Sequence, residues 1–173
     1  MHAFRRAGYA RMSVAGLESA TGLSVSSLYN AYGDKAGLFR AALEHYVATV
    51  ISLRLRTHAG SQAGLEDLEG LLLTLFEPPL DDGYGCLVTN SAIEFAGADH
   101  DSADGVTIAL ATVATHIEQV LRRELGRPAA EEAAGLVASY HGLLVLSRAG
   151  LLDAHHRAAV RAEFARLRAL RDA

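Results

Sequence analysis

The chain has 173 residues, of which 50% are hydrophobic, with a single cysteine and a net charge of −4 at neutral pH. This length and apolar content allow one compact unit or two small joined ones, and one cysteine excludes an internal disulfide framework. The apolar runs are far shorter than the roughly 18 to 20 residues of a membrane-spanning helix, and the basic N-terminus lacks the apolar stretch of a signal peptide. We therefore expect a cytoplasmic protein.

The stretch from Ser13 to Lys35, SVAGLESATGLSVSSLYNAYGDK, predicts two short helices joined by a tight turn. Ser13 is a favourable N-cap, with Val14 and Leu17 following at core-facing positions. Gly22 can close this helix because it tolerates the left-handed conformation, and Leu23 is expected to pack beneath the turn. With Ser24 capping the next helix, the pattern is typical of a helix-turn-helix.

The second of these helices carries an apolar stripe, Val25, Leu28 and Tyr32, and short hydrogen-bonding side chains on its other faces. Such side chains can contact base edges and phosphates without keeping a helix out of a major groove about 12 Å wide. Lys35, in the first turn of the following helix, is expected to contact a phosphate. The predicted DNA-binding residues are Ser13, Ser24, Ser26, Ser27, Tyr29, Asn30 and Lys35.

The run from Tyr9 to Tyr46 resembles the DNA-binding domain of the tetracycline-repressor (TetR) family of bacterial regulators, and LYNAYGDKAGLF is its most specific part. The resemblance implies a homodimeric regulator that binds double-stranded operator DNA, most often a repressor that a small molecule releases. Two helices with a Gly-Leu-Ser turn also occur in domains that bind no DNA. A helical dimerisation or adaptor protein without DNA binding is therefore the alternative.

The charge is distributed unevenly along the chain. Residues 1–46 hold five basic and three acidic side chains, which gives +2, so the remainder carries −6. Phosphate attraction is thus confined to the front of the chain, although +2 is a weak field for a DNA-binding domain. We predict a DNA-binding domain over 1–46 and a helical effector-binding and dimerisation domain over 47–173.

The first helix is expected to be truncated, because residues 2–7 give less than two turns, whereas the domain that the chain resembles begins with a longer helix. So short a helix is marginal alone. We expect a form extended by about 15 to 25 residues to melt at a higher temperature and to bind DNA more tightly, with most of the gain lost at high salt.

The rest of the sequence predicts only helices, so the expected fold is all-α: a three-helix head followed by a helical ligand-binding and dimerisation domain. Apolar residues recur at spacings of three and four, and Gly or Pro ends most segments. The predicted helices cover 35–58, 62–77, 86–96, 103–125, 129–149 and 154–171. The helix over 35–58 joins the two domains and is the expected lever between them.

The last two helices carry the prediction of a dimer. The helix over 129–149 is apolar nearly all round, so one chain cannot easily cover it. In the family that the chain resembles, the final two helices pack with those of a second subunit as a four-helix bundle. The predicted interface residues are Leu136, Leu143, Val160, Phe164 and Leu167. The alternative is that the helix over 129–149 is central within one chain.

Polar side chains on otherwise apolar helices suggest a ligand chamber. Burying them without partners would cost about 1 to 3 kcal/mol each, which a bound small molecule could offset. The predicted ligand-binding residues are Phe76, Tyr84, Cys86, Asn90, Glu94, Thr112, His116 and Tyr140. The alternative is that the polar groups bond to one another or face solvent.

A ligand that releases the protein from DNA must prefer the conformer whose two DNA-binding heads no longer match major grooves about 34 to 36 Å apart.

The sequence predicts neither an enzyme nor a metal or cofactor site. His155 and His156 with Asp153 are ligand-type residues, but they lack the spacing that directs side chains at one ion. Glycine-rich phosphate loops, G-x-S-x-G elbows and H-E-x-x-H motifs are all absent from the sequence.

Overall fold

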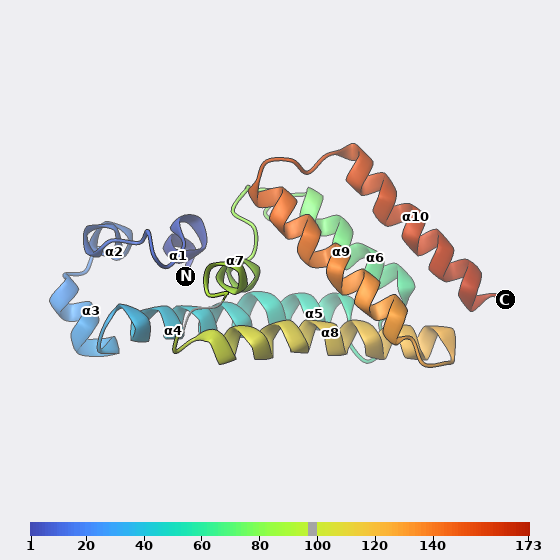
Figure 1. Cartoon of the computed structure of the whole chain (residues 1–173), viewed down its shortest axis with the longest axis horizontal. Coiled ribbons are helices and arrows are strands. Elements are labelled where there is room, and N and C mark those ends of the chain that lie inside the picture. The colour runs from blue at the N-terminus through green and yellow to red at the C-terminus, as the bar shows by residue number, and fades with distance from the viewer. Residues whose placement is uncertain (97–99) are drawn as a thin grey trace. The chain divides into compact units, whose positions relative to one another are not determined.

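The computed structural model describes residues 1–96 and 100–173, and every regular element that they form is a helix (Figure 1). The all-α prediction is confirmed. No helix in these two ranges is long and apolar enough to cross a membrane.

The chain folds into two compact units, and each takes two segments of the sequence. The first unit consists of Met1–Val50 and Cys86–Leu110, and the second of Ile51–Gly85 and Ala111–Ala173. Residues 86–110, which the sequence analysis assigned to the C-terminal domain, thus belong to the same unit as the helix-turn-helix.

The first unit is built from short helices with clear start and stop signals. Its helices are α1 (His2–Ala7), α2 (Val14–Thr21), α3 (Val25–Tyr32), α4 (Lys35–Tyr46), α7 (Leu87–Glu94) and the first part of α8 (Ala103–Leu125). As predicted, Ser13 and Ser24 cap α2 and α3, and Asp34 caps α4 by accepting from Gly37 N at 2.8 Å. Gly22 closes α2 in the left-handed conformation, with φ of 70°.

Aromatic rings fill the centre of the first unit. Phe39 of α4 is fully buried, and its ring centroid lies 5.1 Å from that of Phe4, 5.2 Å from Tyr9 and 5.5 Å from Phe95. Phe95 directly follows α7, so this cluster is one reason why α7 packs with the N-terminal helices. Offset and edge-to-face ring contacts of this kind add stabilisation beyond area burial.

Three side chains predicted to face the core are exposed instead. Val14, Leu23 and Tyr32 are 42%, 52% and 46% exposed, whereas Leu17 and Leu28 are buried. Each of these helices has only two turns and buries one central side chain, which is Leu17 in α2 and Leu28 in α3. The inward stripe is therefore narrower than the apolar pattern predicted.

The second unit is larger and mostly aliphatic. Its elements are α5 (Ser52–His58), α6 (Leu65–Leu73) with a 3₁₀ turn (Thr74–Phe76), the remainder of α8, α9 (Ala130–Arg148) and α10 (Ala154–Arg171). Figure 1 shows α6, α9 and α10 running beside one another. The bounds of α8 and α10 match those predicted from the sequence.

The predicted helix over 35–58 contains one irregular turn. A π-helix, Val47–Ile51, lies between α4 and α5. Tyr46, which precedes the π-helix, and Ile51, its last residue, are both buried and are five positions apart, which suits the wider π turn. The hydroxyl of Thr49 donates to the carbonyl of His45 at 2.7 Å within this stretch.

Candidate functional site

The exposed face of α3 is the candidate nucleic-acid interface. Leu28 is buried, and at about 100° per residue Ser26 and Asn30 lie nearly opposite it, within about 40° of each other. Both side chains are exposed. The helix thus has one residue in the core and two small polar residues on its outermost ridge.

The start of α3 is held by three side chains. The Ser24 hydroxyl accepts from Ser27 N at 3.2 Å and lies 3.0 Å from the Ser27 hydroxyl. A carboxylate oxygen of Glu18 accepts from Val25 N at 2.8 Å, which satisfies a second free donor of the first turn. Sequence analysis predicted the serine cap but missed Glu18, because its partner lies seven residues away in the next helix.

The remaining predicted DNA contacts lie beside this ridge or at helix starts. Ser13 is exposed and accepts from Gly16 N at 3.1 Å, and Tyr29 is half-buried. The ammonium of Lys35 lies 4.6 Å from the centroid of the Tyr9 ring and 3.4 Å from the carbonyl oxygen of Ala10. Lys35 is therefore already engaged within the unit, through a cation–π contact and a hydrogen bond.

Three of the predicted ligand-binding residues belong to the first unit, and two of them have hydrogen-bond partners there. The Glu94 carboxylate accepts from Tyr9 N at 2.8 Å and from Ala10 N at 2.6 Å, and Asn90 Nδ2 donates to the Arg5 carbonyl at 3.5 Å. Cys86 is buried at the start of α7. Glu94 and Asn90 thus fix the chain around α1, which is a different role from the one predicted.

The other five predicted ligand-binding residues belong to the second unit. Tyr140 is buried, with the Arg54 guanidinium 6.0 Å above its ring, and His116 Nδ1 lies 2.9 Å from the Thr112 carbonyl within its own helix. The Tyr84 carbonyl accepts from Arg148. Among the eight predicted ligand-binding residues, only Phe76 lines one of the two cavities described below. The predicted constellation is therefore not assembled around either of them.

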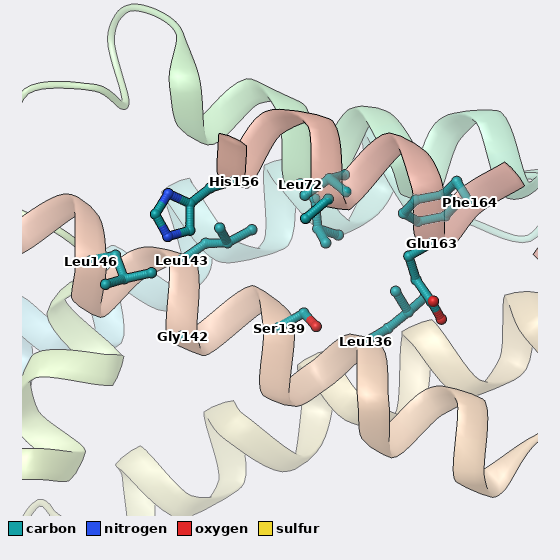
Figure 2. Close-up of a pocket in the computed structure, with 11 residues that line it drawn as sticks. Leu72, Leu136, Ser139, Gly142, Leu143, Leu146, His156, Glu163 and Phe164 are labelled. Atoms are coloured by element: carbon teal, nitrogen blue, oxygen red, sulfur yellow. The ribbon is translucent and has the colours of Figure 1, made fainter. Parts of the chain in front are cut away.

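An apolar groove of about 270 Å³ lies between α9 and α10 (Figure 2). Leucines of α9, Phe164 of α10 and Leu72 of α6 form its walls, and Ser139, His156 and Glu163 supply its polar groups. The Arg166 guanidinium hydrogen-bonds the Glu163 carboxylate and holds its pKa below the ordinary value, so this carboxylate is ionised and paired near neutral pH. The remaining walls of the groove are apolar.

A second cavity, of about 490 Å³, lies beside Phe76 and the start of α10. The Arg157 guanidinium sits 5.1 Å above the Phe76 ring and pairs with Glu77 at 3.2 Å. Asp81 and Asp153 also line this cavity. It is therefore more polar than the groove, with an aromatic wall.

The five predicted dimer-interface residues are buried by the chain itself. Leu136, Leu143, Val160, Phe164 and Leu167 are each at most 6% exposed. Because α10 packs on α6 as well as lying beside α9, the apolar face of both helices is already covered. The exposed residues of α9 and α10 are mostly small, and include Ala134, Gly135, Ala138, Gly142, Ala158, Ala162, Ala165 and Ala169.

The predicted ligand-type residues at the start of α10 form a helix cap. Asp153 accepts from His155 N and His156 N, and its carboxylate lies 2.6 Å from His156 Nδ1. Within 1–96 and 100–173, no group of three His, Cys, Asp or Glu side chains is placed to hold a metal ion.

A capped helix-turn-helix with a polar exposed ridge, followed by further helices, is the architecture of many helix-turn-helix DNA-binding proteins. Residues 1–42 match the model of the family described as bacterial regulatory proteins, tetR family. The match to this family therefore covers the three N-terminal helices and the first part of α4.

Similar solved structures extend the match in fold to nearly the whole chain. Two cysteine mutants of the TetR family transcriptional regulator CifR, each complexed with 26bp double-strand operator DNA, are 24% identical, with TM-scores of 0.74 and 0.75. The match covers 94% of this chain and 94% and 93% of those chains. A TetR family regulator from Cytophaga hutchinsonii is 20% identical, with a TM-score of 0.73, and 98% of this chain matches 87% of it. No curated protein sequence matches significantly.

Proposed function

We propose that the protein is a ligand-responsive repressor that binds operator DNA as a homodimer through α3 and leaves it when a small molecule binds. The observation that carries this proposal is the α2–α3–α4 head, whose helix starts are capped and whose outer ridge offers Ser26 and Asn30 to a groove. The similar CifR chains were crystallised with operator DNA, which supports the same partner for this chain.

Operator binding is tested by a gel shift on the DNA adjacent to the protein's own gene, at several salt concentrations, with unrelated DNA of equal length as competitor. We expect specific binding that resists competitor and weakens as salt rises, because phosphate contacts release counterions. Equal affinity for both DNAs at every salt concentration would contradict the proposal and favour the adaptor alternative.

We propose that the dimer forms through the exposed small residues of α9 and α10. Alanine and glycine let two helices approach closely, since the interaxial distance depends on the side chains at the contact. Gly135 and Gly142 have no atom within 4 Å of a built Cβ, so this surface of α9 is open in the single chain. The groove between α9 and α10 continues the same face with apolar side chains.

The dimer proposal is tested with Ala138→Glu and Ala162→Glu, and with Ala111→Glu on the exposed side of α8 as the matched control. We expect both interface variants to sediment as folded monomers, because the interface would bury an unpaired charge. Helical circular dichroism should be retained. Dimers from both variants, with the same association constant as the control, would contradict the proposed face.

We propose the cavity beside Phe76 as the effector site. Its volume lies within the range of small-molecule sites, and it joins an aromatic wall to the charged groups of Asp81 and Arg157. A thermal-shift screen of metabolites provides the probe. With any stabilising compound, Phe76→Ala should lose the shift and still bind DNA, whereas His116→Ala should keep the shift. The reverse pattern would favour the site predicted from the sequence.

A further inference from the structure

We propose that Asn30 reads an adenine in each half-site of the operator, with Ser26 as the second base-reading side chain, so that recognition centres on an A·T base pair. This inference rests on the proposed operator binding and assigns what α3 recognises. Ser24 and Ser27 then position the helix and carry little sequence information.

The geometry of α3 selects these two residues. Opposite the buried Leu28, the ridge formed by Ser26 and Asn30 projects furthest from the unit, while Ser27 and Ala31 lie on one flank and Tyr29 on the other. Four residues along an α-helix rise about 6 Å, or nearly two base-pair steps of about 3.4 Å. The two side chains therefore face different base pairs.

The hydrogen bonds of α3 distinguish the side chains that position the helix from those that can contact bases. The hydroxyls of Ser24 and Ser27 lie 3.0 Å apart, and the Ser24 hydroxyl also accepts from Ser27 N. By contrast, the side chains of Ser26 and Asn30 make no hydrogen bond or ion pair with any described residue. Their hydrogen-bonding capacity is available to a partner outside the chain.

The chemistry of the ridge favours adenine over guanine. An asparagine amide offers one donor and one acceptor, which match the N7 acceptor and N6 donor of adenine in the major groove. Guanine is read mainly by Arg or Lys, and neither α2 (VAGLESAT) nor α3 (VSSLYNAY) contains one. Serine can contact several bases, so Asn30 carries most of the discrimination.

The first experiment is selection of bound duplexes from a randomised library by the full chain, followed by sequencing. We expect a two-fold symmetric motif with an invariant A·T pair in each half. The same selection with Asn30→Ala should lose the preference at that pair only. Ser19→Ala, which removes an exposed hydroxyl group from α2, is the matched control and should select the wild-type motif.

The second experiment replaces the selected adenine by 7-deazaadenine, which lacks the N7 acceptor. The replacement should weaken wild-type binding by about tenfold, within the range expected for one bidentate base contact, and should leave Asn30→Ala unaffected. A motif with G·C at the Asn30-dependent pair, or an equal deaza effect in both proteins, would overturn the inference while leaving operator binding intact. If no motif is enriched, the proposed function fails as well.

Discussion

Gly37 lies where α4 begins, close against the end of α3. Its N–H donates to Asp34 Oδ1, and a Cβ built on it would lie 2.0 Å from the carbonyl oxygen of Tyr32. A backbone atom cannot move aside as a flexible side chain can. Any residue other than glycine here must push α3 and α4 apart.

Gly37→Ala should therefore destabilise the protein, although glycine to alanine in a helix usually stabilises by about 0.5 to 1 kcal/mol. We expect a loss of about 1 to 3 kcal/mol in the free energy of unfolding, measured by urea titration, from overpacking. Gly105→Ala in α8 is the control, because its nearest neighbour is Leu43 Cδ2 at an ordinary 3.7 Å. Equal stabilisation of Gly37→Ala and Gly105→Ala would contradict this prediction, because α3 and α4 would then move apart without loss of stability.

His141 should make stability depend on pH. Burial lowers the pKa of its imidazole, so the folded chain keeps it neutral where the unfolded chain, with a pKa of about 6.5, takes up a proton. As the pH falls through about 6.5, the unfolded state binds more protons and the free energy of unfolding falls. His141→Gln should reduce this fall between about pH 7.5 and pH 5.5 in urea titrations.

The control for this titration is His155→Gln, at an exposed position on α10. The free energy of unfolding of this variant should depend on pH as that of the wild type does. His58, whose pKa is lowered by burial and then by Arg54, acts in the same direction, so His141→Gln should remove only part of the effect. A pH dependence identical to that of wild type would contradict the assignment to His141.

At the scale of whole helices, Glu94 ties α7 to the N-terminal segment of the first unit. Because its carboxylate holds the amides of Tyr9 and Ala10, Glu94→Ala should lower the free energy of unfolding by about 1 kcal/mol, a value reduced by its exposure. DNA affinity should fall with it. Glu44→Ala, an exposed acid of α4, should change neither quantity. Unchanged stability in Glu94→Ala would contradict the structural role.

The sequence predicted the bounds of helices that have long periodic patterns and clear stop signals. It did not predict which helices pack against one another. The bounds of α8 and α10 follow from apolar spacing and from flanking Gly, Pro and Asp residues. The place of α7 depends on hydrogen bonds between residues 85 positions apart in sequence. Local patterns carry no information on such contacts, so they could not predict that α7 packs with the N-terminal helices.

The candidate site shows the same division. Ser13, Ser24 and Asp34 were predictable as caps because a cap and its amide lie within three residues. The predicted interface residues are apolar and buried, but the sequence pattern could not tell that α10 packs on α6. An apolar stripe predicts burial, and only the tertiary packing determines which helix buries it.

For the whole molecule, the small positive charge of residues 1–46 limits the phosphate attraction available to the DNA complex. Lys35→Ala should lower affinity about equally for operator and random DNA and reduce the salt slope by about one unit if its ammonium meets a phosphate. Arg56→Ala, exposed in the second unit, is the control. An unchanged slope with a lower melting temperature would restrict Lys35 to its contacts with Tyr9 and Ala10.

The π turn at Val47–Ile51 marks a place where the chain can lose one residue without disturbing the packing of its helix. A π turn is an α-helix that has accepted one additional residue, so deleting exposed Ala48 should restore spacings of four and keep Tyr46 and Ile51 on the buried face. Urea titration should show a small change in the free energy of unfolding. Deleting Ala42 instead would rotate all later side chains of the helix by about 100° and should disrupt their packing. Natural homologues should therefore vary in length by one residue within this turn and keep a constant length through α4.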